Sequence, residues 1–407
     1  MKEYQSYTLK NGLRIIHKPL DNNVSYCGFT IDAGTRDENP DEFGMAHFVE
    51  HMLFKGTDKR KSFHILNRME SVGGEINAYT NKEETVIYSV FLEAHFERAF
   101  ELLTDLTFHS VFPQKEINKE IEVILDEINS YEDSPSELIF DEFENIVFRD
   151  SQLGHNILGE ADILKTFDTP KTKKFVQKYY SPDNIVFFSL GKTDIKKVIK
   201  LAEKYLSEIN PANLKQERIQ PLTVVHTSEK VDKDTIQTHA IIGGRSYDIH
   251  DKKRRVLHLL NNILGGPGMN SRLNIALREK RGYVYNVESN MISYTDTGIF
   301  SIYFGSDKRN AKKCISLINK ELKILREKQL SSSQLASAKK QLTGQTGVAG
   351  DNHENLALSL GKSFLRYNHF NSMEEMIRKI DSITAKELIE VANEIFDENN
   401  LNYLIYE

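Results

Sequence analysis

No stretch of the sequence stays apolar over the ~20 residues that a membrane-spanning helix requires. The longest apolar runs, such as NIVFFSLG (184–191), are short enough to be buried strands. The first residues, MKEYQSYTLKNGL, lack the apolar core and the small-residue cleavage site of a secretory signal. We therefore expect neither membrane association nor export.

Positive charge is not in excess, and cysteine is scarce. The formal net charge of −6 argues against a dedicated nucleic-acid binder, because such proteins gather Lys and Arg against phosphates. The two cysteines, Cys27 and Cys314, are far apart in the sequence, and each lies among apolar residues. Two buried reduced thiols are favoured over a disulfide or a metal site, and they indicate a reducing, cytoplasmic location.

What the sequence does contain is an alternation of strand and helix patterns. Alternating apolar residues predict strands at 13–20, 25–34 and 85–92. Apolar residues at every third or fourth position predict amphipathic helices at 93–106 and 113–128. Strands and helices that alternate in this way indicate a protein of the α/β or α+β class.

The second half of the sequence repeats the first. Segments 29–36 and 47–56 resemble segments 239–246 and 257–266, both at the same offset (257 − 47 = 210), and two further matches follow in the same order. Each half should therefore fold in the same way.

We accordingly predict an α+β protein with two homologous domains, each an antiparallel-rich sheet packed with helices. The predicted domains are residues 1–214 and residues 215–407, joined near the polar, proline-containing segment 209–222.

The segment GMAHFVEHMLFKG (44–56) places three titratable residues among apolar ones. On a helix, His47 and His51 lie one turn apart on the same face, so both imidazoles can reach one cation. Glu50 borders that face and could take a proton from a metal-bound water without being a ligand. The equivalent positions of the second half hold Leu257, Leu260 and Asn261. The fold therefore does not need the trio, and metal binding is favoured over two ordinary core histidines.

A third ligand is required, because catalytic zinc is usually held by three protein side chains. The predicted helix 114–130 carries Glu120 and Glu127 two turns apart, beside a stripe of isoleucines. A carboxylate near buried apolar surface is costly unless it is paired or bound to a metal. We predict Glu127 as the third ligand and Glu120 as a residue that orients a histidine, although a solvated Glu120 is nearly as well supported. His155 reads as a packing residue rather than a fourth ligand.

At this point a resemblance is clear. The motif H-x-x-E-H, together with GTRDENPDEFGMAHFVEHMLFKGT, ESVGGEINAYTNKEETVIY and EVILDEINSYEDSPSEL, resembles the pitrilysin/insulinase family of inverted zincins over essentially the whole chain. The size resembles a bacterial-like member of its mitochondrial-processing-peptidase-type branch. In that family two histidines and a glutamate 76 positions further on bind zinc, which implies one Zn2+ per chain on His47, His51 and Glu127 (127 − 51 = 76). It also implies Glu50 as the catalytic base and Glu120 as an extra catalytic carboxylate.

The resemblance extends to the substrate. Segment 265–287 is similar to a second-half motif of these peptidases, which implies that Arg278 and Tyr285 hold the scissile carbonyl (285 − 278 = 7). Pro267 departs from the commonest form of the glycine loop there, and the loop lacks the patterns of nucleotide-binding loops. Without the resemblance, Arg278 would read as a solvated charge.

The family also adds the substrate to a strand edge, which here implies contacts at Asn77 and Ala78. For either residue alone, an ordinary edge strand is an equal alternative.

These features predict a zinc-dependent metalloendopeptidase that hydrolyses unfolded peptides or short polypeptides, with Glu50 as general base on zinc-bound water. Larger single-chain relatives enclose their substrate with four such domains, so the resemblance implies a homodimer, or a heterodimer with a related chain. The alternative is a non-catalytic, peptide-binding or structural subunit of a peptidase-like heterodimer. Such a subunit should have lost Glu50 or a ligand, and this chain retains them all.

Overall fold

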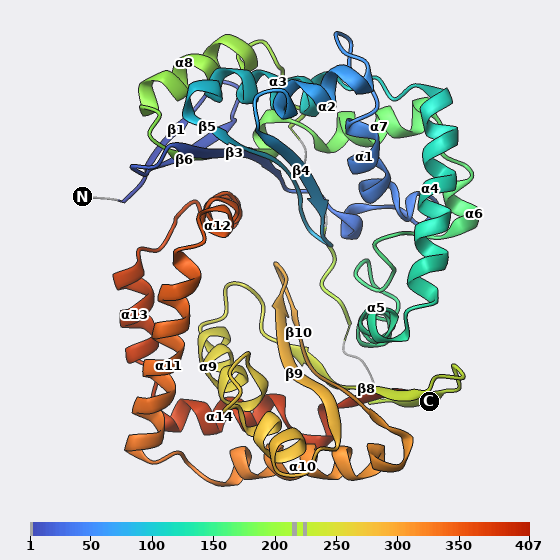
Figure 1. Ribbon diagram of the computed structural model, residues 1–407, viewed down its shortest axis with the longest axis vertical. Helices are drawn as coiled ribbons and strands as arrows, with labels where there is room; N and C mark the ends of the chain where they lie inside the picture. Colours follow the sequence, from blue (N-terminus) through green and yellow to red (C-terminus); the bar gives the residue numbers. More distant parts are fainter. Residues whose placement is uncertain (1–2, 214–217, 223–225) are drawn as a thin grey trace. The chain divides into compact units, whose positions relative to one another are not determined.

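The computed structural model describes residues 3–213, 218–222 and 226–407 (Figure 1). The chain forms two compact units. Unit 1 comprises Met1–Ile128, Asn156–Arg218 and Ala349–Ser372, and unit 2 comprises Asn129–His155, Ile219–Val348 and Met373–Glu407. The predicted boundary between residues 214 and 215 lies outside the described residues. Each unit contains a segment from the other half of the sequence, whereas the sequence predicted two contiguous domains.

Unit 1 is built on a six-stranded sheet in the order β1-β2-β6-β3-β5-β4. Its strands are β1 (Gln5–Thr8), β2 (Arg14–Pro19), β3 (Val24–Ile31), β4 (Glu75–Thr80), β5 (Thr85–Leu92) and β6 (Ile185–Gly191). Strands β2 and β6 are parallel, and the other neighbouring pairs are antiparallel. Strand β4 therefore lies at one edge of the sheet.

Helices cover both faces of this sheet. They are α1 (Met45–Leu53), α2 (Ser62–Glu70), α3 (Phe96–His109), α4 (Gln114–Glu132), α6 (Ala161–Leu164), α7 (Thr169–Tyr179), α8 (Ile195–Leu206) and α12 (His353–Tyr367). On one face, Phe29 and Phe187 of the sheet pack with Phe100 of α3 in the larger core. On the other face, Phe188 packs with Phe364 of α12, a helix that comes from the second half of the sequence.

Unit 2 repeats this arrangement with a five-stranded sheet in the order β7-β11-β8-β10-β9. The strands are β7 (Ser228–Val231), β8 (Gln237–Ser246), β9 (Val284–Ser293), β10 (Gly298–Asp307) and β11 (Asn402–Tyr406). The helices are α5 (Pro135–Val147), α9 (Lys253–Gly265), α10 (Ala311–Glu327), α11 (Ser332–Gly350), α13 (Met373–Asp381) and α14 (Ala385–Ile395). One face of the sheet packs against α5, which comes from the first half of the sequence.

The two sheets have the same topology. Strands β2, β6, β3, β5 and β4 correspond in order to β7, β11, β8, β10 and β9, and in each sheet the first two of these strands are parallel. The internal duplication and the α+β fold are thereby confirmed. The predicted strands and helices are present as β2, β3, β5, α3 and α4. Cys27 and Cys314 are buried and free, as expected. Within the described ranges, no helix combines the length and apolarity needed to cross a membrane.

Helix α12 lies unusually close to the sheet of unit 1 at Gly361. A Cβ atom at this position would lie 2.5 Å from the ring of Phe188 and 2.5 Å from Oγ1 of Thr30. Such overlap forces side chains and backbone to shift. In α11, by contrast, a Cβ atom at Gly344 would meet nothing within 4 Å.

The same substitution should therefore have opposite effects at these two sites. We expect Gly361→Ala to lower the free energy of unfolding by about 1–3 kcal/mol through overpacking. Gly344→Ala should raise it by about 0.5–1 kcal/mol, because alanine restricts the unfolded chain. Thermal unfolding of the two variants measures both effects. Equal midpoints would contradict the close packing of α12.

Candidate metal centre

Helix α1 carries the three titratable residues, and its first turn is fixed by its surroundings. Gly44, which precedes it, has a φ of 94°, and a Cβ atom there would lie 2.8 Å from the carbonyl oxygen of Leu158. Only glycine adopts this conformation without strain. The Glu38 carboxylate accepts the backbone N–H groups of Gly44 and Ala46 at 2.9 and 2.7 Å. It thus pairs with N–H groups at the start of the helix that have no partner within the helix. Burial raises the pKa of the Glu38 carboxyl well above its ordinary value, while these N–H groups and Lys82 oppose the rise.

The predicted ligands lie together. His47 Nε2 and His51 Nε2 are 3.9 and 3.8 Å from Oε2 of Glu127 on α4. One ligand atom from each residue lies within 4.8 Å of the others, and no other group of this kind occurs among the residues that the structure describes. His155 is buried and is not part of it.

The donor set suits a zinc ion. Two imidazole nitrogens and a carboxylate are common zinc ligands, and bonds of ~2.1 Å in tetrahedral geometry place ligand atoms about 3.4 Å apart. The distances to Glu127 exceed this by only a few tenths of an ångström. Burial lowers the pKa of His47 to about 4, and the neighbouring His51 adds to the effect. His47 is therefore neutral at pH 7, which is the form that binds a metal.

Glu120 orients one of the two histidines. Its Oε1 lies 3.0 Å from Nδ1 of His51, and its Oε2 lies 2.6 Å from Nζ of Lys55. The contact with Nδ1 leaves Nε2 of His51 available on the side of Glu127. Burial opposes ionisation of Glu120, but His51 and Lys55 outweigh it and lower the pKa of this carboxyl. Lys55, which lies just after the end of α1, was not predicted from the sequence.

Glu50 is half-buried beside the ligands. Burial raises the pKa of its carboxyl above the ordinary value, while Thr80 and His51 oppose the rise. A carboxylate with a raised pKa in such a position can accept a proton and release it again. Thr80 ends strand β4, so Glu50 lies where α1 meets the edge of the sheet.

Asn77 and Ala78 lie on that edge strand. Asn77 is exposed and Ala78 is half-buried against the core of unit 1. They pair with Tyr88 and Ile87 of β5 on one side, and β4 has no neighbour in the sheet on its other side among the described strands. The geometry is therefore that of a strand to which another strand can be added.

Arg278 and Tyr285 lie in unit 2. Arg278 is exposed in the π-helix Asn274–Glu279, and Tyr285 is exposed at the beginning of β9. The Tyr285 hydroxyl donates a hydrogen bond of 3.0 Å to Oδ1 of Asp307, which raises the pKa of the tyrosine. Their predicted role toward a scissile carbonyl stays a prediction.

Comparisons with known proteins identify two family matches along the chain. Residues 15–161 match the family described as Insulinase (Peptidase family M16). Residues 167–342 match the family described as Peptidase M16 inactive domain. The first match contains all residues of the candidate metal centre, and the second begins within unit 1 and extends into unit 2.

Proteins similar over almost their whole length include an uncharacterized zinc protease of Rickettsia bellii, 34% identical over 100% of this chain and 98% of that protein. An uncharacterized zinc protease of Bacillus subtilis is 30% identical (97% and 96%). The mitochondrial-processing peptidase subunit beta of Saccharomyces cerevisiae is 29% identical (95% and 87%). The crystal structure of a protease from Helicobacter pylori has the same fold, with a TM-score of 0.90 at 21% identity over 99% of both chains. The chain therefore belongs to the insulinase family of peptidases, M16.

Proposed function

We propose that the protein is a zinc-dependent metalloendopeptidase that hydrolyses unfolded peptides or short polypeptides. The observation that carries the proposal is the convergence of His47, His51 and Glu127, with Glu50 beside them on the same helix. The relatives named zinc proteases support it.

The protein's own groups divide the chemistry between them. His47, His51 and Glu127 would hold one Zn2+ per chain, which supplies Lewis acidity toward the scissile carbonyl and lowers the pKa of water. Glu50 would accept the proton of the attacking water and deliver it to the leaving amine. Glu120 keeps Nδ1 of His51 engaged, so that the ring presents Nε2.

Peptide binding is proposed along β4. Backbone groups at the free edge would pair with an extended substrate, with Asn77 and Ala78 as contacts. Strand addition requires an extended substrate backbone, so flexible peptides are favoured over folded proteins.

A non-catalytic, peptide-holding subunit is the competing function. The names "inactive domain" and "subunit beta" among the matches are consistent with such a non-catalytic subunit. The presence of all three ligand residues and of Glu50 favours catalysis, because a subunit that only holds peptides needs none of them. Hydrolysis of a fluorogenic peptide by the zinc-loaded protein separates the two functions.

Glu50→Gln is the sharpest test of the mechanism. We expect the variant to retain about one zinc per chain, because all ligands remain. Hydrolysis should fall by roughly 100- to 10,000-fold, because the proton acceptor is lost. Glu122→Gln, on the exposed face of α4, is the control and should leave both properties unchanged. Near-normal hydrolysis by Glu50→Gln would refute the assigned role.

Loss of Glu120 should weaken zinc binding without removing a ligand. In Glu120→Ala, His51 loses its partner at Nδ1, and we expect a zinc affinity about 10- to 100-fold lower in a chelator competition. Glu116→Ala, on the same helix but paired with Lys119 rather than with a predicted ligand, should bind zinc normally. Equal affinities of the two variants would show that Glu120 does not support the metal site.

We further propose a two-fold dimer, in which the metal centre of one chain is completed by Arg278 and Tyr285 of its partner. The alternative partner is a related chain, as the name of the yeast relative suggests for that protein. A closed two-fold arrangement would form two equivalent sites.

Mixing two inactive variants tests this arrangement. After subunit exchange between Glu50→Gln and Arg278→Ala, half of the dimers are mixed, and one of their two sites carries no defect. About a quarter of the wild-type activity should return. If each site were completed within one chain, mixing would restore nothing. A monomeric mass in solution would also contradict the proposal.

The expected cytoplasmic location stays a prediction.

A further inference from the structure

The turn between β4 and β5, residues 81–84, is held far more tightly than a surface hairpin needs. Asn81 N–H donates to the carbonyl of Glu84 at 2.8 Å, which closes the turn. From outside, the N–H groups of Thr35 and Arg36 donate to the carbonyls of Asn81 and Lys82 at 3.2 and 2.7 Å. The loop that leads into α1 thus pairs directly with this turn.

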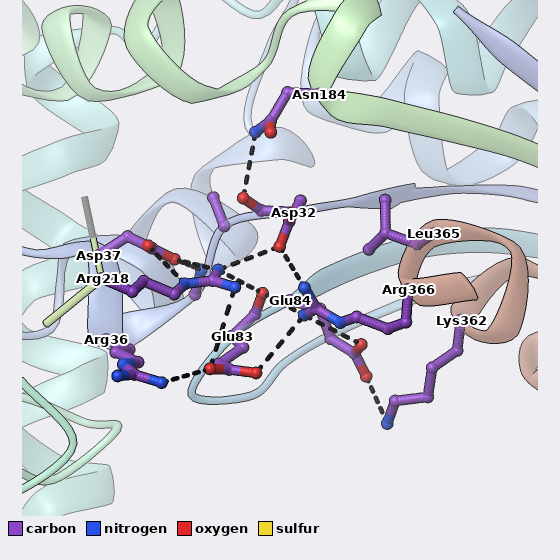
Figure 2. A network of polar contacts seen from close by, with 12 residues as sticks. Asp32, Arg36, Asp37, Glu83, Glu84, Asn184, Arg218, Lys362, Leu365 and Arg366 are labelled. Atoms are coloured by element: carbon purple, nitrogen blue, oxygen red, sulfur yellow. Dashed lines mark hydrogen bonds and ion pairs between the residues drawn. The ribbon is translucent and has the colours of Figure 1, made fainter. Parts of the chain in front are cut away.

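Two arginines from distant parts of the chain converge on the remaining carbonyl of the turn. Nη2 of Arg218 and Nη2 of Arg366 donate to the backbone oxygen of Glu83 at 3.0 and 2.8 Å, and Figure 2 shows the two guanidinium groups on either side of it. A carbonyl oxygen has two lone pairs, so both are used. Each guanidinium also holds the loop before α1: Arg218 binds both oxygens of Asp37 at 3.0 and 2.8 Å, and Arg366 binds Asp32 at 2.5 Å.

The charges of this cluster balance. Its cations are Arg36, Arg218, Lys362 and Arg366, and its carboxylates are Asp32, Asp37, Glu83 and Glu84. The side chains of Arg218 and Arg366 are only 9% and 8% exposed. A buried ion pair often contributes little net stability, but removal of one partner is strongly destabilising, because it leaves a buried charge without a partner.

The turn borders the features that would handle a peptide. Thr80 precedes it and lies beside Glu50. Strand β4, which ends at the turn, provides the free edge of the sheet and packs against α1. Lys82 within the turn is buried and interacts electrostatically with Glu38, the carboxylate at the start of α1.

We propose that Arg218 and Arg366 are positioning residues for the peptide substrate. By holding the carbonyl of Glu83, they fix the turn, and through it they set the free edge of β4 against α1. The role toward substrate rests on the proposed function, whereas the role toward the turn does not. Lysine cannot replace them, because a single ammonium group lacks the planar fork that reaches a carboxylate and a carbonyl together.

The test compares Arg366→Lys with Arg14→Lys. Arg14 is the matched control, because it donates to the carbonyls of Phe364 and Leu365 at the end of the same helix, α12, without touching the turn. Arg218→Lys is a second variant of the clamp, in case Arg366→Lys does not fold. Both clamp variants retain the positive charge.

The first measurement is amide hydrogen exchange of zinc-loaded protein over residues 75–92, with residues 114–132 of α4 as the internal reference. We expect exchange about tenfold faster in residues 75–92 of Arg366→Lys and Arg218→Lys, and no change there in Arg14→Lys. The reference helix should be unaffected in all variants. Unchanged exchange in the clamp variants would overturn the inference, whatever the protein's activity.

The second measurement is the affinity for a fluorescent flexible peptide, determined in the Glu50→Gln background so that the peptide is not cleaved. The clamp variants should bind about tenfold more weakly, with zinc content unchanged, and Arg14→Lys should bind normally. Faster exchange with unchanged peptide affinity would show that the clamp serves stability alone and would refute the positioning role. If no form bound or cleaved peptides, the wild type included, the proposed function would fail, while the exchange data would still decide on the clamp.

Discussion

The carboxylate of Glu38 at the start of α1 is the contact on which the candidate site depends. It accepts the N–H groups of Gly44 and Ala46 in the interior of unit 1, where water does not compete. A helix of nine residues is too short to be stable by itself. Its first turn must therefore be held from outside, and the direction of that turn determines where His47, Glu50 and His51 point. Lys82 links the same carboxylate to the turn after β4.

The duplicated fold separates architecture from chemistry. In unit 1, helix α1 follows strand β3. In unit 2, helix α9 follows β8, the strand equivalent to β3. Its residues Leu257 and Leu260 are buried where α1 has His47 and Glu50. Leucine is the better core residue, because a buried imidazole or carboxyl must be compensated by a partner or a metal. The polar trio of α1 therefore has a stability cost that only a function explains.

Many of the strands and helices, and much of the candidate site, could be predicted from the sequence, because they depend on residues close together in the chain. The period of apolar residues identified the strands and helices, and the spacing of His47, Glu50 and His51 places them on one side of a helix. The placement of Glu127 beside the histidines followed from its helix and from family resemblance. The repeat between the two halves predicted that the two halves fold alike, but it did not predict the order of the strands.

What could not be predicted depends on contacts between distant residues. The packing of α12 on the sheet of unit 1 leaves no periodic signal, since an amphipathic helix does not specify its partner. Arg218 lies in a polar segment and reads as a solvated charge, yet it is almost fully buried. Hydrogen bonds to a backbone carbonyl, such as that of Glu83, impose no pattern on the sequence. Lys55 was missed because lysines are ordinarily at the surface.

The central claim is that peptide hydrolysis depends on one metal ion held by His47, His51 and Glu127. The most direct test is to remove metal from the purified protein with a chelator and to add Zn2+ back in measured steps while following cleavage of a flexible peptide. The account predicts no cleavage by the metal-free protein, a linear return of activity, and a plateau at about one zinc per chain. Full activity without metal, or a metal-saturated protein that never cleaves a peptide, would contradict it.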